Sequence, residues 1–168
     1  MEEKGMSWWV ARTRHGSELK VRNQLSALGV ESFVPTRMRR SSRGKGMVEE
    51  PLLNSMIFLR ATKVEALDLI HFRGVKADYM FDYARHAMMS VMDKEMEDFR
   101  KVFDLSRDEG GLVDVPLSAG EQVRVMRGAL SGVEGHILEY QGHTYVDVSL
   151  MNCLHARAKV PRAWLEKI

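Results

Sequence analysis

The sequence lacks the features that would point to a secreted or a membrane protein. It contains one cysteine, Cys153, so no disulfide can form within the chain, and a reducing compartment is expected. No apolar run approaches the ~20 residues that a membrane helix needs. The first residues, Met-Glu-Glu-Lys-Gly, have no apolar segment of a secretory signal. We therefore expect a cytoplasmic protein that does not associate with membranes.

Signatures of catalysis and of metal or cofactor binding are also missing. The glycines near Lys45 do not form a phosphate-binding loop, because Arg39 stands where the first glycine of that motif should be. The six histidines show no His-x-x-x-His spacing, and a single cysteine cannot form a Cys-x-x-Cys pair. A lone cysteine is most often inert. We predict that the protein is not an enzyme, with no catalytic residues, metal or cofactor.

Negative charge is scarce in the first third of the chain. Between Arg12 and Lys45 lie nine basic residues, which only Glu18 and Glu31 oppose. Such a local excess of positive charge is typical of a surface that contacts phosphates, and the alternative is an ordinary solvated surface.

The first hundred residues alternate between strand and helix patterns. The segment 18–28 has apolar residues at helical spacing and ends at Gly29, and Val64, Leu67 and Ile70 have the same spacing. Four β-prone segments surround these two helices: 7–13, 31–36, 53–60 and 75–81. The resulting β-α-β-β-α-β order predicts a split-βαβ, ferredoxin-like domain. A polar, glycine-containing hairpin loop is expected at 41–46.

The remainder of the chain predicts a helix, a linker and a small all-β domain. A helix over 91–105, with Val91, Phe99, Val102 and Phe103 as packing residues, would end the first domain. Residues 106–119 have the composition of a linker. Residues 120–138 contain a turn with three glycines, Gly128, Gly132 and Gly135, between alternating segments and resemble the KOW motif. We predict an α+β protein whose domains span 1–105 and 120–168, the second being an SH3-like barrel with these strands: 121–127, 134–140, 143–150 and 156–161.

Together, these segments resemble the NusG family of transcription elongation factors. Ser-Trp-Trp-Val at 7–10 is similar to the opening strand of the family, and Phe33-Val34-Pro35, Arg73-Gly74-Val75 and 93–96 (Asp-Lys-Glu-Met) follow at family spacing. The chain departs from the family where Leu53-Asn54-Ser55-Met56 replaces Phe-Pro-Gly-Tyr and where Gly128-Ala129-Leu130 replaces Gly-Pro-Phe. These departures resemble specialised members such as RfaH and the UpxY-type regulators of capsular polysaccharide loci.

The resemblance implies two partners for the first domain. In the family, an apolar depression binds the clamp helices of the largest RNA polymerase subunit, and the matching positions are Trp9, Met56 and Phe58. Specialised members also contact the non-template DNA strand of the transcription bubble. The resemblance, with the positive charge, assigns DNA contact to Arg14, Lys20 and Gln24 and, at the hairpin, to Arg40, Arg43 and Lys45. Arg22 could instead be an ion-pair partner.

The resemblance also implies a partner surface on the second domain. General members bind Rho or a ribosomal protein through the phenylalanine that Leu130 replaces, and this replacement puts both partners in doubt. We expect an antitermination factor for a long operon, with polysaccharide biosynthesis as the expected pathway. The alternative is an RNA-binding or ribosome-associated KOW module, which would need exposed aromatic residues on the sheet, where only Phe58 is available.

Overall fold

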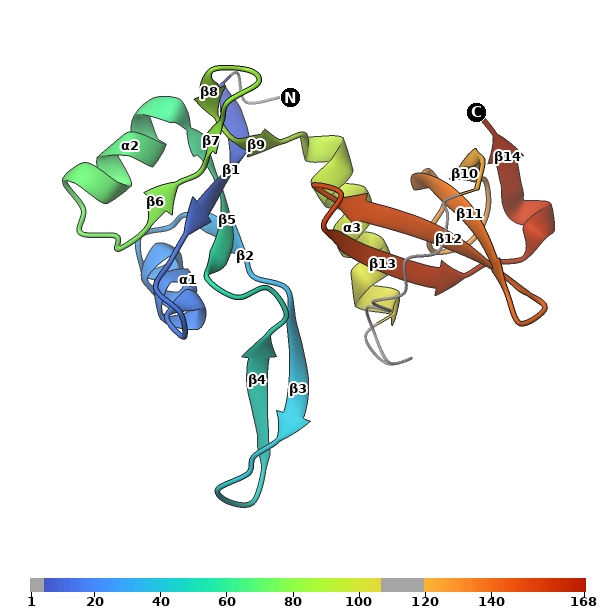
Figure 1. The fold of residues 1–168 in the computed structure, drawn as a ribbon, viewed down its shortest axis with the longest axis horizontal. Coiled ribbons are helices and arrows are strands. Elements are labelled where there is room, and N and C mark those ends of the chain that lie inside the picture. Colours follow the sequence, from blue (N-terminus) through green and yellow to red (C-terminus); the bar gives the residue numbers. More distant parts are fainter. Residues whose placement is uncertain (1–4, 107–119) are drawn as a thin grey trace. The chain divides into compact units, whose positions relative to one another are not determined.

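A computed structural model describes residues 5–106 and 120–168 of the chain. Contacts divide it into two compact units, Met1–Met92 and Asp93–Ile168, which we call the N-terminal unit and the C-terminal unit. The predicted linker 106–119 lies outside the described residues, apart from its first position. Figure 1 shows the elements of both units.

The N-terminal unit is built on one antiparallel sheet with the order β2-β5-β1-β6, in which β9 also pairs with β1. The predicted β-α-β-β-α-β order is therefore confirmed for this unit, and the short strands β7 to β9 follow it. In chain order, its elements are β1 (Met6–Arg12), α1 (Glu18–Ala27), β2 (Glu31–Phe33), β3 (Thr36–Arg40), β4 (Met47–Pro51), β5 (Met56–Thr62), α2 (Lys63–His71), β6 (Asp78–Tyr79), β7 (Phe81–Asp82), β8 (Ala87–Met88) and β9 (Ser90–Val91).

Helices α1 and α2 cover one face of this sheet and form the core with it. Val21 and Leu25 of α1 and Ala66 and Leu69 of α2 are buried against alternate residues of β1 and β5. Thr62 caps α2 by accepting the N–H of Glu65, whose carboxylate accepts the N–H of Thr62 in return. The predicted apolar stripe of α2 was wrong at its start, because Val64 is 79% exposed and Ala66 takes the core position.

Strands β3 and β4 form a two-stranded hairpin that projects from the N-terminal unit (Figure 1). Pro35 separates β2 from β3, and proline cannot donate a ladder hydrogen bond. The tip closes where the N–H of Ser41 donates to the carbonyl of Gly46 at 3.0 Å, with Gly46 at a φ of 122° that suits glycine. The sequence predicted the loop at 41–46 but not the strands that carry it away from the sheet.

In its described residues, the C-terminal unit combines an α-helix and a short 3-10 helix with a five-stranded antiparallel sheet of order β13-β12-β11-β10-β14. The expected β-rich unit is confirmed, with β11 and β12 at the predicted positions, whereas closure of the sheet into a barrel stays a prediction. In chain order, its elements are α3 (Asp93–Ser106), β10 (Gln122–Val125), β11 (Glu134–Tyr140), β12 (His143–Leu150), β13 (Leu154–Lys159), the 3-10 helix η2 (Arg162–Trp164) and β14 (Leu165–Lys167).

Helix α3 packs on strands β12 and β13. Met96, Phe99, Val102 and Phe103 are buried, and the rings of Phe99 and Phe103 stack with centroids 5.7 Å apart. Val91, expected in this helix, instead lies in β9 opposite Trp8. The contacts therefore place the predicted last helix of the first domain in the C-terminal unit, while the domain boundaries at 105 and 120 stay a prediction.

Polar contacts at the start of α3 join it to loops of the same unit. Asp98, which is 3% exposed, accepts from the Lys94 ammonium at 2.7 and 2.8 Å and from the N–H of Glu134 at 3.1 Å. Lys94 also donates to the carbonyl of Gly132 at 2.8 Å, and Glu95 accepts the N–H of Met151 at 3.0 Å. A buried carboxylate that accepts three hydrogen bonds from two donor groups is a specific anchor, because losing either donor leaves a buried charge less well satisfied.

Candidate functional site

The register of β1 and β5 decides which predicted polymerase-binding residues share a face. Val10 lies opposite Phe58 and Arg12 opposite Met56, whereas Trp9 lies opposite Leu59. Because opposite residues point to the same side, Met56 and Phe58 share the outer face, which we define by Trp8, Val10, Met56 and Phe58. Trp9 points to the helix-covered face, where its indole N–H donates to the carbonyl of Ala61 at 2.9 Å. The structure therefore does not bring Trp9 together with Met56 and Phe58.

Within the outer face, Met56 is the predicted residue that keeps accessible surface. Phe58 has an exposed fraction of 0% and its ring centroid lies 6.3 Å from that of Phe33, while Met56 is half-buried. Trp8 and Val10 on the same face are also buried, so the accessible surface of this face belongs to Met56. Trp8 lies on this face in place of Trp9, which the sequence could not reveal because alternation in an apolar strand does not say which side the helices cover.

A buried carboxylate fixes the turn that leads into Met56. Glu18 is 2% exposed, and its Oε1 accepts the N–H of Ser55 at 2.6 Å and that of Gly16 at 3.4 Å. Ser55 has a φ of 59°, and its carbonyl accepts the N–H of Thr13 at 3.0 Å. Burial raises the pKa of Glu18, but the N–H donors, above all that of Ser55, outweigh it, so the net pKa lies below the ordinary value.

Two of the predicted DNA-contact residues, Lys20 and Gln24, lie along one flank of α1, and Arg14 precedes the helix. Arg14 and Lys20 are exposed, and Gln24 is half-buried, with its amide N–H donating to the carbonyl of Gly74 at 3.1 Å. Lys20 and Gln24 are four residues apart and so face the same side. The bond to Gly74 uses one donor of Gln24 and leaves its amide oxygen available as an acceptor.

The loop that contains Gly74 also carries an exposed aromatic residue, which was not among the residues predicted from the sequence. Phe72 follows α2, is 83% exposed and stands two positions before Gly74, the partner of Gln24. Its ring meets that of His71 edge-on, with centroids 6.3 Å apart. A signal was present in the sequence, because Phe72 does not continue the predicted stripe of Val64, Leu67 and Ile70.

The basic residues of the β3–β4 hairpin separate into paired and unpaired groups. Near the base, Glu50 pairs with Arg37 at 2.8 Å and with Arg39 at 3.4 Å, and the hydrogen bond from Arg37 holds the pKa of Glu50 below its ordinary value. In the part of the chain that the structure describes, no carboxylate is within ion-pair distance of the exposed cations at the tip, which are Arg40, Arg43 and Lys45. The tip is therefore the strongest candidate for phosphate contact.

Arg22 forms an ion pair within the protein, which was the alternative that the sequence left open for this residue. Its guanidinium forms a two-pronged contact with Glu49, with Nη1 and Nη2 at 2.6 and 3.0 Å from the two carboxylate oxygens. The side-chain hydrogen bond to Glu49 raises the pKa of Arg22. Arg22 is thus occupied within the protein, unlike Arg40, Arg43 and Lys45.

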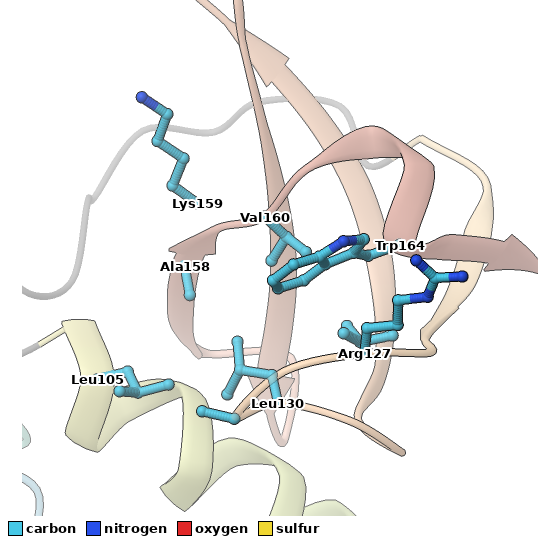
Figure 2. Close-up of a pocket in the computed structure, with 9 residues that line it drawn as sticks. Leu105, Arg127, Leu130, Ala158, Lys159, Val160 and Trp164 are labelled. Atoms are coloured by element: carbon cyan, nitrogen blue, oxygen red, sulfur yellow. The ribbon is translucent and has the colours of Figure 1, made fainter.

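In the C-terminal unit, Leu130 lies in the wall of a pocket of about 200 Å³. Figure 2 shows Leu130 with Val160, Ala158 and the Trp164 indole around this pocket, and Leu105 reaching it from α3. Leu130 is only 6% exposed, so it belongs to the lining of the pocket rather than to the outer surface. Its predicted role as a partner contact would therefore require a ligand group that enters the pocket.

Residues 5–106 and 120–168 contain no candidate metal site and no candidate membrane-spanning helix. Their histidine, cysteine and acidic side chains do not gather in groups of three or more that could hold a metal ion. Their helices are all too short or too polar to cross a membrane. Burial raises the pKa of the Cys153 thiol, which reduces the thiolate needed for nucleophilic chemistry.

Comparisons with known proteins give one family. The family model described as transcription termination factor NusG matches residues 6–100. A solved structure of Thermotoga maritima NusG is similar to the chain with 19% sequence identity and a TM-score of 0.46, covering 97% of each chain. No curated protein matches the chain.

Proposed function

Because the chain belongs to the NusG family, whose members are transcription factors that bind RNA polymerase, we propose that it is a specialised elongation factor that suppresses pausing and termination in a long operon. The observation that carries this proposal is the family match over residues 6–100, which extends across nearly all of the described N-terminal unit. Membership in a family of non-enzymatic factors also supports the expectation that the protein catalyses no reaction.

The outer face of the sheet is the proposed contact with the clamp helices of the largest polymerase subunit. A partner helix docks its apolar side on an apolar surface, and a flexible methionine adapts to such a surface. Met56 is half-buried at the start of β5, and Glu18 holds the turn before it. Met56 is the proposed direct contact, Phe58 supports it, and Trp9 acts from the core of the unit.

The proposed mechanism is a shift of population without covalent chemistry. A factor that binds the elongation-competent state of the clamp more tightly than the paused state favours the former by that difference in affinity. A tenfold difference corresponds to about 1.4 kcal/mol. The proposed DNA contacts, through the α1 flank and the hairpin tip, would add affinity and choose the locus. We propose an operon for surface polysaccharide synthesis as the locus, on the UpxY-like features of the sequence.

The C-terminal unit is proposed to be a KOW domain whose sheet closes as an SH3-like barrel. Its contact with a ribosomal protein or Rho would use the pocket at Leu130. The alternative, an RNA-binding module, finds less support because Phe58 is the one aromatic residue that the predicted strand 53–60 offers for stacking on a base.

Binding of the full-length protein to the isolated clamp-helix fragment of polymerase tests the proposal. Met56→Asp places a carboxylate on the apolar contact and should weaken binding about tenfold or more. Met47→Asp is the matched control, because Met47 is an equally flexible residue, 55% exposed, on the hairpin. Equal affinities for wild type and Met56→Asp would refute the assigned surface. Absence of binding to polymerase, together with tight binding to structured RNA, would favour the RNA-binding alternative.

A further inference from the structure

Ser55, the last residue before β5, has both polar backbone groups bonded to another part of the N-terminal unit. Its N–H donates to Oε1 of Glu18 at 2.6 Å, and its carbonyl accepts the N–H of Thr13 at 3.0 Å. Thr13 lies between β1 and α1, and Glu18 is the first residue of α1. The turn before β5 is therefore fastened to the connection between β1 and α1 through a single residue.

The backbone of Ser55 has a conformation that residues with a side chain seldom adopt. Its φ of 59° lies in the left-handed region, which is unfavourable for residues other than glycine. Such a conformation persists where the surrounding structure imposes it. A hydrogen bond to a carboxylate is shorter and stronger than one between neutral groups, and the Ser55 N–H makes such a bond. The Glu18 carboxylate is thus the group best placed to hold Ser55 in this conformation.

Glu18 is itself held in one place at the start of α1. Its side chain is buried, and Oε1 also accepts the N–H of Gly16 at 3.4 Å. The preceding Ser17 makes no side-chain capping bond, and a negative charge is favourable at a helix N-terminus. Glu18 therefore stabilises the start of α1 and also fixes Ser55. The two effects can be separated by experiment, because only the second passes through Ser55.

We propose that Glu18 is a positioning residue for the polymerase contact, which acts through the conformation of Ser55 on the side chain of Met56. Met56 follows Ser55 directly, so a change of φ at Ser55 would redirect the chain as it enters β5. Glu18 is 2% exposed and does not touch a partner itself. This inference rests on the proposed function, because it names what sets the affinity of the proposed contact.

Removal of the carboxylate should weaken polymerase binding, because Ser55 is then free to leave the left-handed region. We expect Glu18→Ala to bind the clamp-helix fragment about tenfold more weakly than the wild type. Glu18→Gln keeps an oxygen that can accept the Ser55 N–H, so its affinity should lie within about threefold of the wild type.

A second substitution at Ser55 should restore the binding that Glu18→Ala loses. Glycine adopts a positive φ without steric cost, so the turn no longer needs the carboxylate to hold it. The double variant Glu18→Ala/Ser55→Gly should recover an affinity within about threefold of the wild type. Its stability should stay below that of the wild type, because the start of α1 still lacks its negative charge.

The test measures two quantities for the full-length protein: the affinity for the isolated clamp-helix fragment and the free energy of unfolding. The variants are Glu18→Ala, Glu18→Gln, Ser55→Gly and the double variant. Glu65→Ala is the matched control, since it also removes a carboxylate from the first turn of a helix in this unit, where Glu65 bonds to Thr62. Glu65→Ala and Ser55→Gly alone should bind as the wild type does.

Recovery of binding in the double variant, with its stability still below that of the wild type, would support the proposal. Affinity that follows stability across the variants, with no recovery from Ser55→Gly, would show that Glu18 is merely structural and would overturn it. Equal affinities for Glu18→Ala and the wild type would also overturn it and leave the polymerase contact intact. Failure of the wild type to bind the fragment would refute the proposed function itself, and this inference with it.

Discussion

Replacement of Asp98 by alanine should detach α3 from the loops of the C-terminal unit. The carboxylate is 3% exposed and accepts from the Lys94 ammonium and from the N–H of Glu134. Lys94 is about half exposed and can turn to water, so loss of its ion pair should cost at most about 1 kcal/mol. The N–H of Glu134 loses a charged acceptor, which should cost about 1.5–3 kcal/mol. We expect Asp98→Ala to destabilise the C-terminal unit by about 2–4 kcal/mol.

Amide hydrogen exchange measured by NMR on the full chain gives the most direct assay. The amide of Glu134 and those of α3 should exchange faster in Asp98→Ala, whereas the amides of β1 and β5 should not change. Glu97→Ala is the matched control, because Glu97 is an acidic residue of the same helix whose partner Lys101 is exposed. That control should cost less than about 1 kcal/mol. Unchanged protection of the Glu134 amide in Asp98→Ala would refute the anchor described above.

Three further predictions follow from single residues. Gly128→Ala should destabilise the C-terminal unit by about 1–3 kcal/mol, because the residue has a φ of 83° and an added Cβ would lie 2.6 Å from the Trp164 ring. Gly132→Ala, at a φ of 89° with no atom within 4 Å, should cost less in the same chemical denaturation assay, and equal costs would contradict the clash. The folded-state pKa of Glu18 lies below its ordinary value of 4.5, so the unfolded chain binds more protons as the pH falls through that region, and the stabilisation present above about pH 4.5 is lost on acidification. The free energy of unfolding, measured as a function of pH, should show this loss in the wild type and not in Glu18→Gln. The same pH dependence in both proteins would contradict the prediction. Phe72→Ala should weaken single-strand binding by about 1–3 kcal/mol and leave duplex binding unchanged, and an equal loss for both would contradict stacking.

The order of elements in the N-terminal unit could be predicted because each carries a local signal. Gly29 ends α1, and alternation marks the strands. The side that each strand presents to the helices could not be predicted from alternation, since β1 is apolar at consecutive positions from Trp8 to Ala11. Only the pairing of Val10 with Phe58 and of Trp9 with Leu59 separates the two faces. The predicted trio of Trp9, Met56 and Phe58 failed to share one face for this reason.

Long-range contacts account for the remaining differences. The apolar spacing of Phe99, Val102 and Phe103 predicted a helix but could not say which sheet that helix covers. It packs on β12 and β13, and Asp98 and Glu95 accept hydrogen bonds from backbone N–H groups that are distant in the sequence, those of Glu134 at the start of β11 and of Met151. In the same way, the charge excess predicted a basic surface, but only the pairing of Arg22 with Glu49 distinguishes an internal anchor from a free cation.

If the proposed DNA contact is correct, the distribution of charge along the β3–β4 hairpin predicts an order of binding events. Arg37 and Arg39 pair with Glu50, and Glu49 pairs with Arg22 of α1, so the unpaired positive charge of the hairpin is concentrated at its tip. A projecting charge attracts phosphates over a longer distance than one held against the body of a protein, and this attraction accelerates encounter. The tip would capture DNA first and the apolar face would dock afterwards, so that salt slows the association rate while the lifetime of the complex depends on the outer face.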